Sequence, residues 1–341
     1  MSTKEQVLKY LQDNKDKYIS GSFLSEELGV SRNAIWKAIN SLKKEGIEID
    51  AISNKGYKIA TSIDVMNADT IKEYIKDSSI RIEVFDSIES TNTYLKEKGS
   101  LGEDEGLLVV AKEQTKGKGR MNRSFSSPKN GGIYFSLLLR PCINPGEALF
   151  ITTIAAVAVV KAIKIVTGKS AGIKWVNDVL LDGKKVCGIL TEGSISMETG
   201  TLDYAVLGIG INVREPDGGY EESIKNIAGP VLTGEEIENV SSRIVAETIN
   251  EFMKHYRKLP NKEFLDDYKN NSVVIDKDVY IIDASHGGLG SAGEIVEKYG
   301  DKLECAHVID IDDDLGLVVK KNDGSIDTLR SGEVSVREIK K

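Results

Sequence analysis

The pattern of the first 60 residues predicts a helix, a helix–turn–helix and a hairpin, in that order. TKEQVLKYLQDN (3–14) has apolar residues at helical spacing. FLSEELGVSRNAIWKAINSLKKEG (23–46) then predicts a short helix, a turn and a longer helix, for which Ser31 is a good N-cap. Two alternating runs over 47–60 predict a β-hairpin. This succession is the order of a winged helix-turn-helix, and it restricts the fold of this part more than any other feature.

The second helix of this unit carries a basic face beside its apolar stripe. Arg32, Lys37, Lys43 and Lys44 lie off the stripe, and such a face suits phosphates and base edges in a DNA major groove. The expected DNA contacts are Ser31, Arg32, Asn33, Trp36, Lys37 and Asn40. Two alternatives stay open: Trp36 can pack against the wing instead, and the whole unit can be an interaction module that does not bind DNA.

Charge is distributed unevenly along the 341 residues, which are too many for one typical domain. Residues 1–62 carry ten Lys and Arg against eight Asp and Glu, whereas the remainder carries 35 against 45. Residues 1–62, called the head below, are basic, whereas the rest of the chain is acidic. This difference indicates that only the head binds nucleic acid. The longest apolar run (151–160) ends at Lys161, too short for a membrane span. With a polar N-terminus and three scattered cysteines, these features predict a cytoplasmic protein without disulfides, zinc or a membrane partner.

The rest of the chain indicates two further domains. Strands and a helix over 147–167 follow a polar linker at 61–70, and Asp182-Gly183 between two strand-like runs predicts another hairpin. Helical patterning covers 234–270, and short β-rich runs follow from residue 272. We predict an α+β chain with a winged helix-turn-helix at 1–62, a mixed α/β domain at 63–271 and a small β-barrel at 272–341.

Two glycine-rich motifs resemble nucleotide-binding sequences without their context. Residues 288–293 fit GxGxxG after a strand, but no helix of sufficient length follows, so a glycine-rich turn is expected. Gly168-Lys169-Ser170 ends like a P-loop, but Ile163 stands where the first glycine belongs. Neither motif predicts a phosphate site.

A cationic loop is the strongest candidate for chemistry. QTKGKGRMNRSFSSP (114–128) lies between two apolar strands, and its residues Lys116 to Arg123 include four cations and two glycines. Loops this long in compact domains are usually functional or disordered. Glycines among cations let N–H groups and side chains converge on one anion. A solvated lysine-rich loop and a nucleic-acid patch are the alternatives; the acidic surroundings favour a small phosphate compound.

Five motifs in order resemble a biotin–protein ligase, in its bifunctional form that also represses the biotin operon. They are Ser90-Thr91-Asn92, Gln114 with Gly117-Lys118-Gly119-Arg120, Lys174-Trp175-Val176-Asn177-Asp178, Lys185-Val186-Cys187-Gly188-Ile189-Leu190 and Gly208-Ile209-Gly210-Ile211-Asn212. A closing Gly332-Glu333-Val334-Ser335 segment and the head add to the likeness, which covers essentially the whole chain. The resemblance implies a central domain of the biotin/lipoate ligase superfamily and a C-terminal SH3-like barrel.

The resemblance implies a two-step reaction and a set of partners. Biotin's carboxylate joins the α-phosphate of ATP, with Mg²⁺ carried on ATP rather than on protein side chains, and pyrophosphate leaves. Biotin then passes from biotinyl-5′-AMP to one lysine of a biotin carboxyl-carrier protein. Cations placed around the α-phosphate stabilise the charge that builds there. Operator DNA, with biotinyl-AMP as corepressor, and a homodimer of the adenylate-bound form complete the implied partners.

Residue roles follow from the same resemblance. The implied catalytic residues are Lys185, Arg120, Lys118 and Asp178. The implied biotin-binding residues are Ser90, Thr91, Asn92, Gln114, Lys118, Gly119, Arg120, Lys185 and Gly188. The implied ATP and adenylate contacts are Gly117, Arg120, Arg123, Phe125, Asn177 and Asn212. Without the resemblance, Lys185 is an ordinary surface hairpin lysine.

The loop also departs from the family pattern. Lys118 replaces the usual first arginine and loses its planar fork. Met121-Asn122 stand where many members have Arg-Gly, and Phe125 replaces a tryptophan. These changes affect how tightly the loop retains the adenylate. Two functional alternatives remain: a ligand-sensing repressor without turnover, and a lipoate-type acyl ligase, whose relatives generally lack the head.

Overall fold

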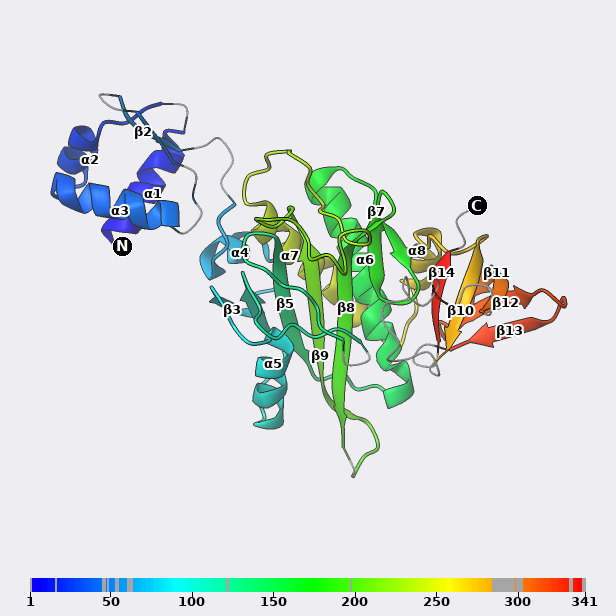
Figure 1. Cartoon of the computed structure of the whole chain (residues 1–341). Coiled ribbons are helices and arrows are strands. Elements are labelled where there is room, and N and C mark those ends of the chain that lie inside the picture. The colour runs from blue at the N-terminus through cyan, green and yellow to red at the C-terminus, as the bar shows by residue number, and fades with distance from the viewer. Residues whose placement is uncertain are drawn as a thin grey trace.

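The chain forms a head, a central sheet and a small terminal sheet (Figure 1). The computed structural model describes residues 2–15, 17–44, 47, 49–52, 55–59, 64–120, 123–196, 198–283, 298, 303–330 and 334–338. Figure 1 shows the head at one end, separate from the central sheet, and the terminal sheet at the other end. The predicted turn at 288–293, Met121-Asn122 and Gly332-Glu333 lie outside the described residues.

The head has the predicted order of elements. They are α1 (Thr3–Asp13), α2 (Gly21–Glu27), α3 (Arg32–Lys44) and the antiparallel strands β1 (Ile49–Ile52) and β2 (Gly56–Ile59). Ser31 Oγ accepts from the N–H of Ala34 at 3.2 Å, so the predicted N-cap of α3 is confirmed. The apolar stripe of α3 is buried against α1 and the hairpin at Ile35, Ala38, Ile39 and Leu42. The head therefore has a core of its own.

The predicted linker at 61–70 is attached to the central domain over part of its length. Asp64 accepts hydrogen bonds from Ser241, from the backbone N–H at 2.8 Å and from the hydroxyl at 2.6 Å. The carbonyl of Val65 accepts from Ser242 Oγ at 2.7 Å. Both serines begin the helix α7 (Val240–Tyr256), where a carboxylate is well placed to cap free N–H groups. A further helix, α4 (Ala68–Tyr74), starts inside the predicted linker.

The central sheet has seven strands among the described residues. Their order across the sheet is β3 (Arg81–Phe85), β4 (Leu107–Ala111), β5 (Gly132–Leu139), β9 (Leu202–Asn212), β8 (Lys184–Ile195), β7 (Asp178–Leu181) and β6 (Gly172–Lys174). Only β3 and β4 pair in parallel; the other neighbours are antiparallel. The predicted hairpin is confirmed, because Asp182 and Gly183 take the positive φ values, 50° and 76°, of a tight two-residue turn between β7 and β8.

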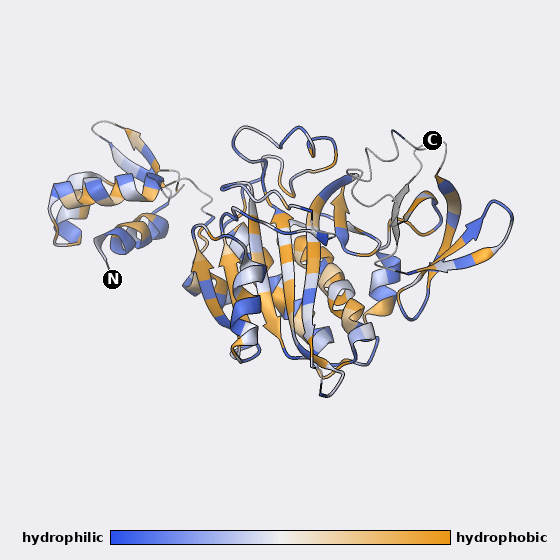
Figure 2. Ribbon diagram, turned by 60° about the horizontal axis from the view of Figure 1, so that its bottom comes forward, coloured by the Kyte–Doolittle hydropathy of each residue, from blue (hydrophilic) through white to orange (hydrophobic). Residues whose placement is uncertain are grey.

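Each face of this sheet packs against different helices. In β4, Leu107 and Val109 contact the cluster of α5 (Thr91–Ser100), whereas Leu108 and Val110 join the main core under α6 (Ala148–Thr167) and α7. Figure 2 shows the hydrophobic residues along the central strands and the helix packed on them. The face that carries α5 is only partly covered, and the candidate site opens there.

Helix α6 is the apolar segment predicted over 147–167. Pro145–Thr167 is long and apolar enough to cross a membrane, but 78% of its most apolar window is buried inside the protein. It packs against α7 and the sheet as a core helix. Gly168 ends it in a left-handed conformation at φ 75°. Gly168-Lys169-Ser170 is therefore a helix terminus, as expected from its incomplete P-loop pattern.

The helical pattern predicted over 234–270 is interrupted. Helix α7 ends at Tyr256 and α8 (Leu265–Asn270) begins nine residues later. Pro260 lies between them, and proline cannot donate the hydrogen bond that a continuing helix requires. The predicted helical patterning therefore corresponds to two helices rather than one.

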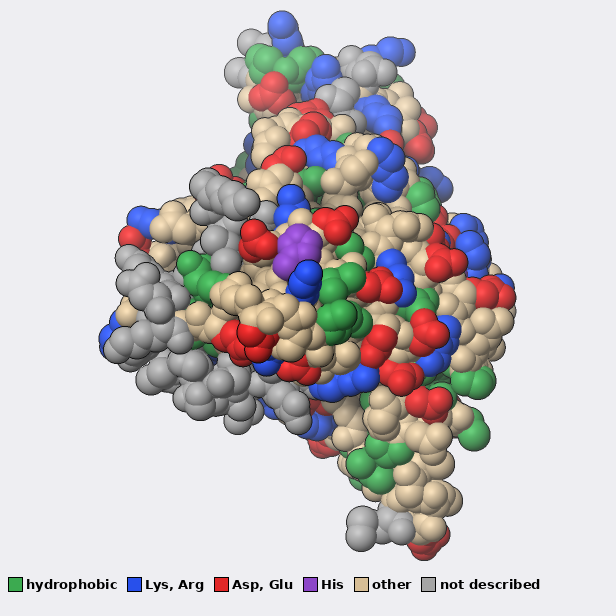
Figure 3. All heavy atoms as spheres, turned by 90° about the vertical axis from the view of Figure 1, so that its right-hand side faces the viewer, with side chains coloured by type: hydrophobic (Ala, Val, Ile, Leu, Met, Phe, Trp, Pro, Cys, Tyr) green, Lys and Arg blue, Asp and Glu red, His purple; other side chains and the backbone are tan. Residues whose placement is uncertain are grey.

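The terminal sheet is open in the part of the chain that is described. Its order is β13 (Ile326–Leu329), β12 (Leu317–Lys321), β11 (Glu304–Ile311), β10 (Asp278–Asp283) and β14 (Val334–Glu338). The two outer strands do not pair with each other, so the expected closed barrel is not confirmed. Trp175 Nε1 donates to the carbonyl of Leu315 at 2.9 Å and joins this sheet to the central domain. Figure 3 shows acidic and basic side chains mixed over this end.

Candidate active site

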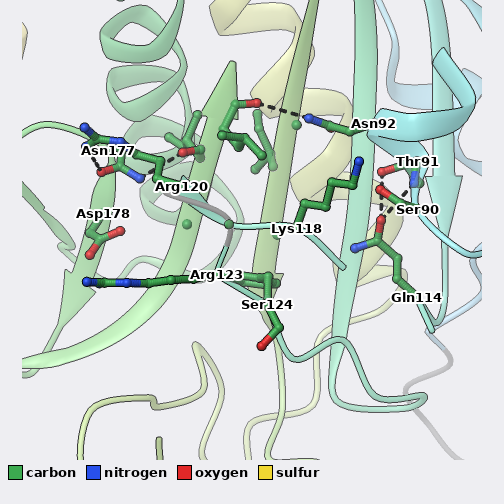
Figure 4. Close-up of a pocket in the computed structure, with 18 of the residues that line it drawn as sticks. Ser90, Thr91, Asn92, Gln114, Lys118, Arg120, Arg123, Ser124, Asn177 and Asp178 are labelled. Atoms are coloured by element: carbon green, nitrogen blue, oxygen red, sulfur yellow. Dashed lines mark hydrogen bonds between the residues drawn. The ribbon is translucent and has the colours of Figure 1, made fainter. Parts of the chain in front are cut away.

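A cavity opens on the α5 face of the central sheet, between the start of α5, strands β7 to β9 and the cationic loop (Figure 4). Its lining residues are Ser90, Thr91, Asn92, Gln114, Lys118, Gly119, Arg120, Arg123, Ser124, Phe125, Asn177, Asp178, Lys185, Gly188, Ile189, Leu190, Gly208, Ile209 and Gly210. Each of the five quoted motifs supplies some of these residues, and the motif Ser90-Thr91-Asn92 supplies all of its own. Segments far apart in sequence thus meet in one place.

The first turn of α5 forms one end of the cavity. Ser90 is the N-cap of this helix, and its side chain accepts from the N–H of Thr93 at 3.4 Å. The N–H and hydroxyl of Thr91 both donate to Gln114 Oε1, at 2.9 and 3.1 Å. Gln114 Nε2 donates to Ser127 Oγ at 3.1 Å and so ties the helix start to the loop. This end presents hydroxyl and amide groups without net charge.

Asn92 is held by groups below the cavity wall. Its Nδ2 donates to Glu192 Oε2 at 2.9 Å, and its Oδ1 accepts from Ser136 Oγ at 2.6 Å. Lys96 Nζ binds the other carboxylate oxygen of Glu192 at 2.8 Å. Burial alone raises the pKa of Glu192, but the hydrogen bonds from Lys96 and Asn92 outweigh it, so its pKa lies below the ordinary value. Glu192 is therefore an anion near neutral pH.

Glycines on β8 and β9 make room for two side chains. A Cβ on Gly210 would lie 2.4 Å from Phe125 Cε1, and one on Gly188 would lie 2.8 Å from Phe125 Cε2. A Cβ on Gly208 would lie 2.1 Å from Asn92 Oδ1. Gly188 and Gly210 are direct partners across the two strands. The glycines therefore form a groove in which Phe125 lies against the backbone.

The cationic loop folds back on itself and points three of its cations at the cavity. Lys118 and Ser124 form an antiparallel bridge, and the N–H of Gly119 donates to the Arg123 carbonyl at 2.8 Å. The N–H of Arg123 donates to the Arg120 carbonyl at 3.2 Å, and both arginines line the cavity together with Lys118. Lys116, the fourth cation, pairs with Glu89 at 2.9 Å outside it.

Arg120 is the most enclosed of these cations. Its Nη1 donates to Asn177 Oδ1 at 2.9 Å, and Asn177 Nδ2 donates to the Ile189 carbonyl at 2.9 Å. Burial lowers the pKa of Arg120, while the negative charge of Asp178 acts in the opposite direction. Arginine keeps its proton under all ordinary conditions, so a fixed positive charge lies at this wall. Asn177 occupies the turn between β6 and β7.

Lys185 reaches the cavity because of a bulge. Strand β8 pairs Cys187 with Val179 but Lys185 with Leu180, so Val186 is an extra residue. In a regular strand Lys185 and Gly188 would point to opposite faces; the extra residue brings both to the cavity face. Lys185 Nζ lies 2.6 Å from Asp178 Oδ1, and 6.0 Å from the centre of the Phe125 ring. A lysine and a carboxylate thus face the ligand space together.

Two predicted contacts are absent from the residues that line the cavity. Gly117 lies behind Phe125, where a Cβ would be 2.3 Å from the Phe125 carbonyl. Asn212 Nδ2 donates to the Lys185 carbonyl at 3.3 Å. Both residues hold parts of the wall in place in this structure, and their predicted contacts with the nucleotide stay predictions.

Several polar residues at the site were missed by sequence reasoning. Ser124 lines the cavity, Ser127 holds Gln114, and Ser136 and Glu192 hold Asn92. Lys96 in turn holds Glu192. Ser136 could have been noticed, because it is a small polar residue in the otherwise apolar and aromatic buried strand GIYFSLLL (132–139). The sequence did not mark Glu192 as a site residue, because acidic residues are common near the end of a partly exposed strand.

The six predicted DNA contacts lie on the head, apart from the cavity. Ser31, Arg32, Asn33, Trp36 and Lys37 are exposed on α3, and Asn40 is half-buried. Trp36 is 57% exposed, so in this structure it is not packed under the hairpin. A row of exposed cationic and aromatic side chains along one helix face is available to a partner.

The cavity has two chemically different ends. Figure 4 shows Arg120, Arg123 and Asp178 on one side. It shows Ser90, Thr91 and Gln114 on the other, with Lys118 between the two groups. A neutral hydrogen-bonding end joined to a cationic end suits an acid with an uncharged polar head and a phosphate compound that meets its carboxylate.

Two family models match the chain. Residues 84–212, which contain the cavity strands and loop, match the biotin/lipoate A/B protein ligase family, and residues 3–58 match an HTH domain. The solved biotin protein ligase from Aquifex aeolicus in complex with biotin and ATP has a TM-score of 0.58 and 25% sequence identity, over 76% of this chain and 99% of that one. Fold, site and matches together define a ligase-type domain joined to a helix-turn-helix head.

Relatives with both parts are known. The bifunctional ligase/repressor BirA of Bacillus spizizenii is 37% identical over 244 residues, or 70% of this chain and 74% of the relative. The Escherichia coli protein of the same description is 32% identical over 208 residues, or 61% and 62% of the two chains. The chain belongs to the family of bifunctional biotin ligase/repressors.

Proposed function

We propose that this chain activates biotin with ATP as biotinyl-5′-AMP and transfers it to a lysine of a biotin carboxyl-carrier protein. We also propose that it represses biotin genes by binding operator DNA through its head, with the adenylate as corepressor. The observation that carries the first proposal is the two-ended cavity: neutral groups at Thr91 and Gln114, and cations at Arg120 and Lys185.

In the first step, a carboxylate oxygen of biotin attacks the α-phosphorus of ATP. The bond from that phosphorus to the oxygen of the β-phosphate breaks, and pyrophosphate leaves. Lys118, Arg120 and Lys185 supply positive charge on three sides of the reacting phosphate, and fixed charges of this kind stabilise the transition state without reorganising. Arg120 is held in place by Asn177 before any ligand arrives.

In the second step, the amine of the carrier lysine attacks the carbonyl carbon of the adenylate, and AMP leaves. The amine must lose a proton during this step. Asp178 is a carboxylate at the cavity wall and can orient that amine or accept its proton. In the ligand-free site Asp178 is paired with Lys185 at 2.6 Å, so a ligand that draws Lys185 to its own anionic groups leaves Asp178 for the amine.

A labelling assay tests the enzyme proposal. The full chain is incubated with Mg-ATP, a carrier domain and either biotin or lipoate, and both pyrophosphate release and carrier labelling are measured. Biotin-dependent release with a labelled carrier is the expected result. Ligand binding without turnover favours the sensing repressor, and a preference for lipoate favours a lipoate-type ligase.

The head makes a separate prediction. Arg32→Ala and Lys37→Ala are expected to weaken operator binding and to reduce its dependence on salt, because each lost phosphate contact lowers the slope of log affinity against log salt by about 0.9. Biotin transfer by the same variants is expected to stay unchanged, since α3 is remote from the cavity (Figure 1). Fluorescence anisotropy on operator DNA at several salt concentrations gives the slope; Lys4→Ala on α1 is the control. An unchanged slope would remove these residues from the DNA interface.

We extend the proposal to organisation and setting. The domain limits are 1–62, 63–271 and 272–341, with the last forming an SH3-like module; its five short antiparallel strands support this. Mg²⁺ enters on ATP, the compartment is the cytoplasm, and the adenylate-bound form is a homodimer. Sedimentation with and without the adenylate tests the last point.

A further inference from the structure

Three consecutive residues, Trp175, Val176 and Asn177, form the turn between β6 and β7. Trp175 and Val176 are buried, and Asn177 accepts from Arg120 Nη1 at 2.9 Å (Figure 4). Ile189 holds one side of Asn177: its carbonyl accepts from Asn177 Nδ2 at 2.9 Å, and its N–H donates to the Asn177 carbonyl at 3.0 Å. The position of this turn therefore determines where Arg120 is held.

A tyrosine on α8 holds the other side of the turn. Tyr268 Oη donates to the carbonyl of Val176 at 3.1 Å. That carbonyl belongs to the peptide that joins Val176 to Asn177, which the contacts with Ile189 do not include. Tyr268 is fully buried, and a buried carbonyl that loses its partner must rotate to find another or stay unpaired at a cost. The hydroxyl therefore fixes the plane of the peptide that enters Asn177.

Helix α8 is itself a rigid support for this tyrosine. Asp267, the residue before Tyr268, binds Lys161 Nζ on α6 at 2.6 Å. The carbonyl of Asn271, just after α8, accepts from the N–H of Ile173 on β6 at 2.7 Å. Strand β6 leads directly into the turn. Since α8 is fixed to both α6 and β6, its tyrosine holds the turn from a well-defined position.

The Tyr268 hydroxyl also lies within electrostatic reach of Arg120. Burial raises the pKa of Tyr268, and the positive charge of Arg120 acts in the opposite direction. The net result is a raised pKa, so the phenol keeps its proton and stays uncharged. A carboxylate in this place would pair with Arg120 and compete with a phosphate, whereas an uncharged hydroxyl holds the turn and leaves the cation for the ligand.

We propose that Tyr268 is a positioning residue that keeps Arg120 at the reacting phosphate, acting through the turn at 175–177. This inference rests on the proposed function and deepens it. Tyr268 is not among the residues that line the cavity, so its effect on the reaction passes through groups that are. A catalytic cation displaced by a fraction of its side-chain length stabilises the transition state less, even when the substrates still bind.

The experiment removes a single hydroxyl group. Tyr268→Phe is compared with wild type and with Tyr256→Phe, the matched control. Tyr256 is also buried, its hydroxyl donates to Glu105 at 2.6 Å, and neither of these two residues lines the cavity. Each full-length protein is mixed with saturating biotin and Mg-ATP without a carrier, and the rate of first-turnover pyrophosphate release is measured. Calorimetry gives the dissociation constant for biotin, and thermal unfolding gives the loss of stability.

Tyr268→Phe is expected to slow first-turnover release by about 10- to 100-fold, the scale of a misplaced catalytic group. The dissociation constant for biotin is expected to change much less, because Thr91 and Gln114 lie on the other side of the cavity (Figure 4). Tyr256→Phe is expected to release pyrophosphate at nearly the wild-type rate although it also loses stability. A purely structural role for Tyr268 predicts that the two variants behave alike.

A double variant shows whether the effect passes through Arg120. Once Arg120→Ala has removed the cation, Tyr268→Phe is expected to slow release little further, so the two changes are non-additive. Additive effects, or a Tyr268→Phe rate no lower than that of Tyr256→Phe, overturn the inference and leave the proposed function intact. A wild type that releases no pyrophosphate in response to biotin overturns the proposed function, and this inference with it.

Discussion

Lys185→Met is expected to slow biotin-dependent pyrophosphate release by about 10²–10³-fold, the usual effect of removing one group that stabilises transition-state charge. The side chain is aimed at the cavity by the bulge at Val186 and lies 2.6 Å from Asp178. Its loss also removes the ion-pair partner of Asp178, so more of that negative charge acts against the phosphates. A radioactive or coupled pyrophosphate assay with saturating ATP gives the rate.

The neighbouring lysine provides a matched control. Lys184 has the same charge, but its Nζ binds the Asn226 carbonyl at 2.8 Å and does not line the cavity. Lys184→Met is expected to retain nearly wild-type activity. If Lys185→Met kept more than about a tenth of the wild-type rate, the electrostatic role given to Lys185 would be wrong.

Gly210→Ala is expected to raise the KM for ATP by about tenfold or more. Its Cβ would lie 2.4 Å from Phe125 Cε1, so the ring must leave the groove. Overpacking of this kind costs about 1–3 kcal/mol, which corresponds to roughly 5- to 150-fold in an equilibrium constant. Steady-state kinetics with ATP and biotin varied separately measure the effect. The KM for biotin is expected to change less, because Thr91 and Gln114 do not contact this glycine.

A double variant separates a specific clash from general damage. Once Phe125→Ala has removed the ring, Gly210→Ala is expected to have little further effect, so the two changes should be strongly non-additive. Gly146→Ala is the control, since a Cβ there meets no atom within 4 Å. Additive effects of Gly210→Ala and Phe125→Ala would contradict the groove described for Phe125.

Much of the fold could be predicted from local patterns. The head follows from the stripe of α3 and its Ser31 cap, and the β7–β8 hairpin from Asp182-Gly183, because short-range chemistry determines both. The helical patterning over 234–270 is confirmed as two helices, and Pro260 lies between them. Closure of the terminal sheet depends on pairing between distant strands, which a local pattern does not specify.

The motifs predicted which residues form the candidate site, but they did not predict how these residues are held in place. Ser90, Thr91, Gln114, Arg120 and Lys185 come together at one cavity, as the resemblance implied. Strand alternation alone gives no sign that Lys185 shares a face with Gly188, because a bulge reverses it. Contacts such as Asn92 to Glu192 join residues 100 positions apart, and nothing in either local sequence marks them as partners.

The attachment of Asp64 to Ser241 bears on how this protein reads DNA. Only residues 60–63 separate Asp64 from Ile59, the last described residue of the head. That length spans at most about 18 Å even when fully stretched. Each head is therefore held close to the start of α7, where Asp64 is bound. In the proposed homodimer, the contact between the two catalytic domains therefore sets the distance between the two heads. That distance must match the spacing of the two operator half-sites, so the surface of an enzyme limits which genes such a repressor can regulate.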